Sequence, residues 1–217
     1  MQTPSRKTAL LSELALFMIG VPLLLVYALP PKAILPVVWA MALFCSSVAN
    51  KVEARRFREY WHYAGVTADE LLLVATRFVI CAVLLTCATV MYQPDMLFSL
   101  WHRSHVFWLA VMVLYPVLSV VPQEIIFRRY LFTRFEGLMS PRVLWLVSGL
   151  GFGFAHIVFQ NWVAPILCGI GGLMFAQTYK RTRSLALVSL EHALYGDFVF
   201  TIGLGHYFFH GAVPVAH

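Results

Sequence analysis

The sequence predicts an all-α polytopic transmembrane bundle with about seven membrane-spanning helices. Hydrophobic residues make up 60% of the 217-residue chain and charged residues only 12%, and the mean hydropathy is +0.77. A water-soluble core of this size cannot enclose so many apolar side chains. Seven mostly apolar windows have the length that crosses a bilayer as a helix: 9–29, 33–49, 71–91, 106–136, 142–159, 162–179 and 185–207.

Each boundary between these windows has a local cause. Pro30-Pro31 ends the first window, and because no small-residue cleavage site follows it, we expect a span and not a signal peptide. Residues 51–70 mix arginines with aromatic side chains, which is typical of a segment along the cytoplasmic interface. The fourth and fifth windows turn at 139–141 and form a hairpin. The sixth carries a small-residue surface suited to close helix packing, formed by Gly169, Gly171, Gly172 and Ala176.

Positive charge is concentrated in alternate connections. Thirteen of the 16 Lys and Arg residues lie at the N-terminus, in 51–58, in 128–142 and in 180–183. Because cytoplasmic loops retain positive charge, this predicts a cytoplasmic N-terminus and an external C-terminus. The net charge of +6 then belongs to the edge that faces the lipid bilayer, so we expect no nucleic-acid partner.

Ionisable groups inside the later windows are the candidates for chemistry, because charges at membrane depth are costly and usually functional. Glu124 and Arg128 are four residues apart, so they share a helical face and can form an ion pair. Counted from the turn at 139–141, Glu124 and His156 both lie about 24 Å along their helices. His192 lies at a compatible level in the last window.

Several kinds of chemistry fit a carboxylate and two imidazoles. They can activate water for attack on a carbonyl carbon and stabilise the resulting oxyanion. They can also bind zinc or relay protons in a transporter. A purely structural interpretation has the charges tying helices together around packed core histidines. The spacing alone does not separate these alternatives.

The polar stretches form three motifs: Gln123-Glu124-x-x-x-Arg128, Phe152-x-x-x-His156 and His192-x-x-x-Gly196. In this order they resemble the motifs of the CPBP intramembrane proteases, also called the ABI family, which include the endopeptidases that trim prenylated CAAX proteins. The family pattern is Glu-Glu-x-x-x-Arg, Phe-x-x-x-His and His-x-x-x-Asn. The resemblance implies a glutamic endopeptidase of a bacterial inner membrane that cleaves a membrane-anchored protein or peptide. It also implies that His156 helps to activate water and that His192 holds the oxyanion.

The sequence departs from that pattern at two positions. Gln123 replaces the leading Glu and cannot accept a proton as a base, so we predict that Glu124 takes its place, positioned by Arg128. That exchange needs a deformed helix, which Pro122 favours. Gly196 replaces the Asn, and Asp197 is the nearest polar group. If Glu124 does not act as the base, the alternative is a catalytically inactive scaffold that escorts a partner.

The predicted organisation is one integral membrane domain over 1–217. Residues 1–105 supply N-terminal helices and the interfacial segment, and residues 106–210 form the catalytic core. No cofactor is expected, and zinc is the less favoured alternative. The predicted site comprises three catalytic residues and four supporting ones, respectively Glu124, His156, His192 and Gln123, Arg128, Phe152, Asp197.

Overall fold

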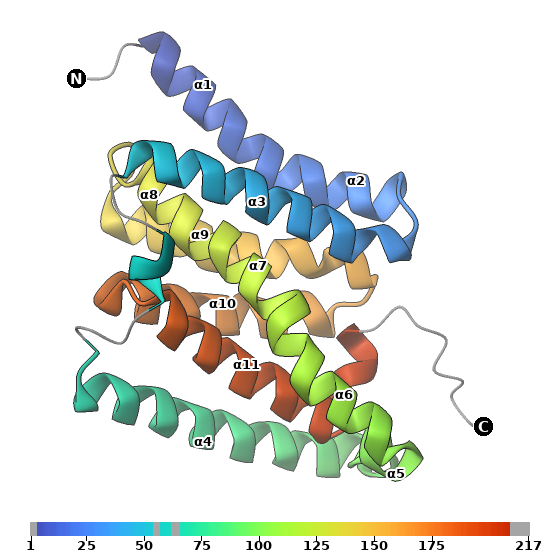
Figure 1. Ribbon diagram of the computed structural model, residues 1–217. Coiled ribbons are helices and arrows are strands. Elements are labelled where there is room, and N and C mark those ends of the chain that lie inside the picture. Colours follow the sequence, from blue (N-terminus) through green and yellow to red (C-terminus); the bar gives the residue numbers. More distant parts are fainter. Residues whose placement is uncertain (1–3, 54–56, 62–65, 209–217) are drawn as a thin grey trace.

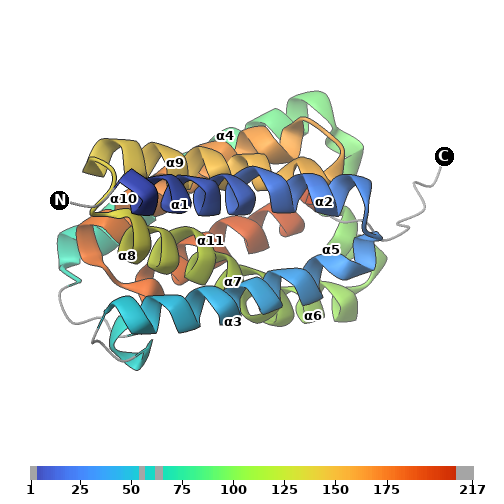
Figure 2. The same cartoon turned by 90° about the horizontal axis from the view of Figure 1, so that it is seen from above.

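The computed structural model describes residues 4–53, 57–61 and 66–208, and within these ranges every regular element is a helix (Figure 1). The helices lie side by side as a bundle, which the view from above confirms (Figure 2). The prediction of an all-α multi-pass protein is therefore confirmed. Residues 209–210 of the predicted catalytic core, and parts of the predicted interfacial segment, lie outside the described ranges.

The first half of the chain forms three long rods. The first consists of α1 (Pro4–Ala15), the π-helical turn η1 (Leu16–Gly20) and α2 (Val21–Tyr27). After η2 (Pro31–Ala33), the second rod is α3 (Ile34–Val52). The third, α4 (Ala68–Tyr92), follows η3 (Phe57–Tyr60) and leads into η4 (Pro94–Met96) and α5 (Ser99–Arg103).

A fourth rod contains the first motif, and two π-helical turns interrupt its α-helix. It consists of α6 (His105–Tyr115), η5 (Pro116–Val120), α7 (Val121–Glu124), η6 (Ile125–Tyr130) and α8 (Leu131–Phe135). Both η5 and η6 are π-helical, a geometry often found at functional sites. Pro122 has no N–H to offer the Leu118 carbonyl one turn earlier, and Trp39 Nε1 donates to that carbonyl at 3.0 Å.

The last helices complete the bundle. They are α9 (Pro141–Ala155), η7 (His156–Phe159), α10 (Val163–Thr182), α11 (Leu185–Thr201) and η8 (Leu204–Phe208). Each of α4, α6, α9 and α11 begins after a Ser or Thr whose side chain accepts a hydrogen bond from the amide three residues later; these caps are Thr67, Ser104, Ser140 and Ser184.

Small residues bring α9 and α10 into close contact, as the sequence predicts. A Cβ on Gly153 would lie 2.6 Å from the Gly169 Cα, and one on Gly172 would lie 2.6 Å from the Gly149 carbonyl oxygen. Gly171 is different, because a Cβ there would make only an ordinary contact with Phe175. Backbone approach at Gly153 and Gly172 therefore sets the distance between these helices.

Five of the seven predicted spans have the length and apolar composition to cross a membrane; among the described residues these are Pro4–Tyr27, Pro31–Val52, Ala68–Tyr92, His105–Phe135 and Pro141–Phe159. The two remaining windows of the prediction correspond to α10 and α11, which do not meet both criteria. The helix α10 carries Lys180 and Arg181 in its last turn, which shortens its apolar part. The helix α11 has only 17 residues and contacts α4, α6, α7 and α10.

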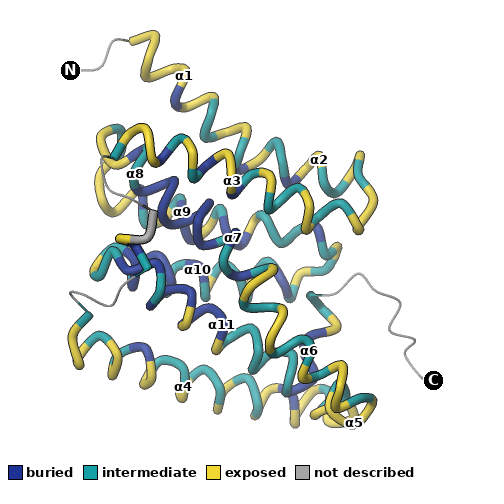
Figure 3. The backbone as a smooth tube through the Cα atoms, in the orientation of Figure 1, coloured by how far each residue is buried: buried dark blue, intermediate teal, exposed yellow. Residues whose placement is uncertain are grey.

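Burial is greatest along the second half of the chain (Figure 3). The region η6–α8 is almost wholly buried, and α11 has a buried first half. By contrast, α4 and α6 expose many large apolar side chains, including Leu72, Leu84 and Leu109, which are 66%, 63% and 56% exposed. Apolar exposure of this extent on long helices fits a lipid environment.

One end of the bundle is tied together by charged and polar side chains. Arg134 pairs with Glu13 at 2.8 Å, joining α8 to α1, and Arg181 pairs with Glu70 at 2.8 Å, joining α10 to the start of α4. Tyr60, in the segment predicted at the interface, is buried beneath the Arg129 guanidinium at 4.6 Å. The basic connections thus gather at one end, and the assignment of that end to the cytoplasm stays a prediction.

Candidate active site

A cavity of about 820 Å³ lies among helices from both halves of the chain. Most of its wall is apolar and comes from α2, α3, α4, α6, α9, α10 and α11. A group of polar side chains, which we call the polar patch, interrupts that wall; it comprises Tyr115, Ser119, Gln123, His156 and His192. Volume and lining are typical of a ligand site, in which a few polar groups orient a mostly apolar ligand.

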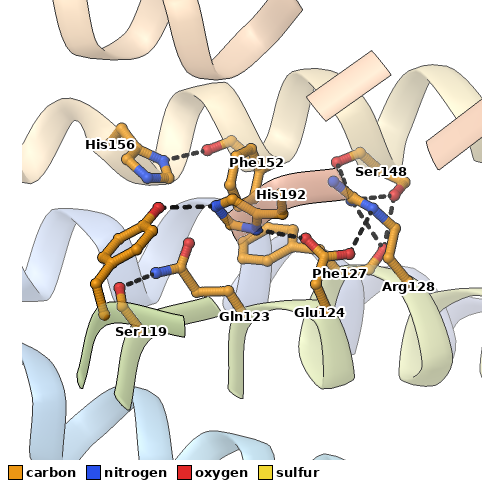
Figure 4. A network of polar contacts seen from close by, with 10 residues as sticks. Ser119, Gln123, Glu124, Phe127, Arg128, Ser148, Phe152, His156 and His192 are labelled. Atoms are coloured by element: carbon orange, nitrogen blue, oxygen red, sulfur yellow. Dashed lines mark hydrogen bonds and ion pairs between the residues drawn. The ribbon is translucent and has the colours of Figure 1, made fainter. Parts of the chain in front are cut away.

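Glu124 lies behind this wall and not on it. Its side chain is fully buried and is not among the cavity-lining residues. One carboxylate oxygen, Oε1, lies 2.8 Å from His192 Nδ1, and Oε2 lies 3.2 Å from Arg128 Nε (Figure 4). The ion pair expected from the four-residue spacing is therefore present. The equal depth of Glu124 and His156 does not bring them together, because Glu124 turns toward His192.

Arg128 neutralises this buried carboxylate and is itself held on several sides. Its Nη1 donates to Ser148 Oγ at 2.7 Å, and its guanidinium lies 5.2 Å from the centre of the Phe152 ring. Ser148 Oγ in turn donates at 2.6 Å to the carbonyl of Phe127, within the π-helical turn η6. A buried charge is tolerated only when it is paired and hydrogen-bonded in this way.

The carboxylate determines the orientation and tautomer of His192. A carboxylate accepts hydrogen bonds, so His192 Nδ1 donates to Glu124 Oε1 and the ring is fixed. The other nitrogen, Nε2, lies 3.1 Å from the Tyr115 hydroxyl. The imidazole also stacks on Phe175, with ring centres 4.8 Å apart. Glu124, His192 and Tyr115 therefore form one chain of contacts that ends at the cavity wall.

His156 is placed differently, at the point where α9 changes into η7. Its Nδ1 lies 2.7 Å from the backbone carbonyl of Phe152, and because a carbonyl can only accept, Nδ1 carries the hydrogen. In the neutral ring Nε2 is then an acceptor. The Phe152 ring packs against both imidazoles, with centre distances of 4.6 Å to His156 and 5.2 Å to His192.

Gln123 lies on the cavity wall, although Glu124 was predicted to act as the base. Its Nε2 donates to Ser119 Oγ at 2.7 Å, and its Oε1 is buried with no hydrogen-bond partner among the described residues. The helix is deformed on both sides of this residue, by η5 and η6, as expected near Pro122. The deformation nevertheless leaves Gln123, and not Glu124, facing the cavity (Figure 4).

Tyr115 and Ser119 are the site residues that the sequence analysis missed. A usable signal exists, because Tyr115, Ser119 and Gln123 recur every four residues and form a polar stripe on an apolar helix. Asp197 does not join the site. It does not line the cavity, and its carboxylate Oδ1 is buried without a hydrogen-bond partner in the part of the chain that the structure describes.

The zinc alternative stays a prediction. Each histidine donates from Nδ1, in His192 to Glu124 and in His156 to a backbone carbonyl, so Nε2 is the nitrogen left to bind a metal. Within the described ranges, no group of three His, Cys, Asp or Glu side chains is close enough together to hold a metal ion. We therefore derive no step through a metal.

Comparison with known proteins gives one match. Residues 105–196 match the family described as Rce1-like, type II CAAX prenyl endopeptidase Rce1-like. The matched region runs from the start of α6 to Gly196 and so contains all three motifs together with Tyr115. Neither the curated proteins nor the solved structures gave a significant match. Through this region, the chain is similar to the CPBP/CAAX protease family.

Proposed function

We propose that this protein is an intramembrane endopeptidase that hydrolyses a peptide bond in a membrane-associated protein. The observation that carries the proposal is the pair of histidines, His156 and His192, on the polar patch of a large apolar cavity. An apolar cavity of about 820 Å³ can take several residues of a membrane-embedded segment. The polar patch then meets one carbonyl group of that segment.

His156 is the base in this proposal. Its Nε2 takes a proton from a water molecule in the cavity while the water oxygen attacks the substrate carbonyl carbon. A tetrahedral intermediate with a negatively charged oxygen forms. His156 then gives its proton to the leaving amine nitrogen as the C–N bond breaks, which returns the ring to its starting state. Gln123 Oε1, which has no partner among the described residues, is available to accept a hydrogen bond from the same water.

Glu124 acts through His192 and not on water. It is bonded to His192 and Arg128, and it does not line the cavity. We therefore assign Glu124 as a positioning residue that fixes the His192 ring beside the oxyanion, while Arg128 holds the carboxylate in place. This replaces the expected roles, in which Glu124 itself took the proton and the protein was a glutamic protease.

The test is comparative membrane proteomics of a deletion strain complemented with single variants. Unprocessed substrate should accumulate in the deletion strain and in strains carrying His156→Ala or His192→Ala. The wild type and the control His102→Ala should process it, because His102 is exposed on α5 and does not line this cavity. Processing by the His156→Ala and His192→Ala strains at the wild-type rate would refute the proposal.

A second candidate is a catalytically inactive protein of the same fold that binds and escorts a membrane partner. The position of Gln123 favours it, because an amide faces the cavity where the resemblance implies a carboxylate. This candidate predicts that His156→Ala restores the wild-type phenotype while the partner keeps its full length. If the His156→Ala strain lost both the wild-type phenotype and the processing of the substrate, that result would favour the protease.

We also propose that the end containing the Arg134–Glu13 and Arg181–Glu70 pairs faces the cytoplasm of a bacterial cell. Reporter fusions test this directly. An N-terminal fusion should be active only with a reporter that functions in the cytoplasm, and a C-terminal fusion only with one that functions outside. The opposite pattern would overturn the orientation.

A further inference from the structure

Gly196 stands where the family motif carries an Asn, and the space beside it is already filled. A methyl group built on Gly196 would overlap the Cε1, Cζ and hydroxyl oxygen of Tyr115. Only glycine therefore fits at this position while the Tyr115 ring is present. The third motif has lost a side chain at the same point where a tyrosine from another helix has entered.

Tyr115 brings a hydroxyl group into that space with a defined orientation. It comes from the end of α6, lines the cavity, and packs its ring edge-to-face against Phe200 at 5.3 Å. Its hydroxyl lies 3.1 Å from His192 Nε2. Because His192 is held from its other nitrogen by Glu124, the hydroxyl is anchored to a fixed ring at the wall of the cavity.

We propose that the Tyr115 hydroxyl, in the space beside Gly196, is the hydrogen-bond donor that stabilises the oxyanion. The inference rests on the proposed protease function. A hydroxyl has one hydrogen and two lone pairs. Because His192 Nδ1 carries the hydrogen that bonds Glu124, Nε2 accepts the phenolic hydrogen at rest, and the hydroxyl turns this hydrogen to the substrate oxygen as the negative charge develops. No covalent bond of Tyr115 changes during the reaction.

The pairing explains the departure of the third motif at Gly196. An oxyanion donor needs to be rigid, dry and aimed at the developing charge, and the ring contacts with Gly196 and Phe200 restrict Tyr115 to one place. Asn at position 196 and Tyr at position 115 exclude each other sterically. A chain with Gly196 thus requires its donor from elsewhere, and Tyr115 is the group that occupies the vacated space.

The experiment measures cleavage kinetics of the substrate found by proteomics, with purified protein in liposomes. Tyr115→Phe keeps the ring and removes the hydroxyl, so kcat should fall by about 10²–10³-fold. KM and the unfolding temperature should stay at wild-type values. The control Tyr179→Phe removes a hydroxyl from a buried tyrosine of α10 that does not line the cavity, and it should leave kcat unchanged.

A double variant tests the replacement itself. Tyr115→Ala/Gly196→Asn removes the ring and places an Asn at position 196. Its kcat should exceed that of Tyr115→Ala at least about tenfold, which is part of the rate effect expected of one oxyanion donor. Gly196→Asn alone should lose activity through the clash. A Tyr115→Phe kcat within twofold of wild type, or no gain in the double variant, overturns the proposal. Full activity of His156→Ala would instead refute the underlying function.

Discussion

The buried Glu124–Arg128 pair allows a quantitative prediction for Arg128→Met. Both side chains are fully buried, and the Arg128 Nε lies 3.2 Å from the Glu124 carboxylate. Methionine has a similar length without the charge, so it leaves Glu124 with His192 as its remaining partner. It also leaves the Ser148 hydroxyl without its guanidinium contact.

Removing one partner of a buried ion pair destabilises a protein by about 3–5 kcal/mol, because the other charge stays buried. For a chain of this size, that corresponds to a fall in unfolding temperature of roughly 6–20 °C. The ion pair of Arg134 with Glu13 is a matched control, because its side chains are 27% and 22% exposed. Arg134→Met should therefore cost only about 0–1 kcal/mol.

The assay is thermal unfolding of the purified variants in one detergent, followed by the fraction of protein that stays monodisperse after heating. The double variant Glu124→Gln/Arg128→Met removes both charges and should recover most of the lost stability. Two results would refute the reasoning. One is an Arg128→Met protein as stable as Arg134→Met, and the other is a double variant no more stable than the single one.

Three further predictions concern packing and buried hydrogen bonds. Gly153→Ala should destabilise the protein by about 1–3 kcal/mol, because the added Cβ meets the backbone of α10. Gly169→Ala is the control: its added Cβ meets nothing within 4 Å, so the unfolding temperature should not change. Ser148→Ala should cost about 1–3 kcal/mol, since it removes a buried hydroxyl that serves a guanidinium and a carbonyl; Ser148→Thr, which keeps the hydroxyl, is the comparison. Asn161→Ala should cost about 0.5–2 kcal/mol through loss of the cap on the start of α10, measured as a lower unfolding temperature.

The sequence predicted the bundle well because its signals are local. Apolar length is a property of short segments, and the N-caps that the structure adds, at Thr67, Ser104, Ser140 and Ser184, are local features too. The number of membrane spans was harder to predict from the sequence. Whether α10 and α11 cross the membrane depends on how neighbouring helices enclose them, which apolar windows do not contain.

The candidate site was predictable in its members and not in its contacts. Motif spacing identified Glu124, His156 and His192. In the structure both imidazoles pack against the Phe152 ring, and Glu124 is hydrogen-bonded to His192. Gln123 and Glu124 are adjacent and so lie about 100° apart around the helix axis, and the π-helical turn η5, which precedes both, determines which of the two faces the cavity. Tyr115 was missed because its partner Gly196 is distant in the sequence and carries no side chain to suggest a contact.

The withdrawal of Glu124 behind His192 also determines what an incoming substrate meets. The polar patch consists of two imidazoles, a phenol, an amide and a hydroxyl, so it contains no carboxylate. An apolar segment that enters the cavity therefore displaces water only from these uncharged polar groups. It does not have to dehydrate an anion, and the free energy of dehydrating an anion is far larger. Under the proposed function, the charge of Glu124 stays out of the cavity and acts through the His192 imidazole where the carbonyl oxygen becomes negative.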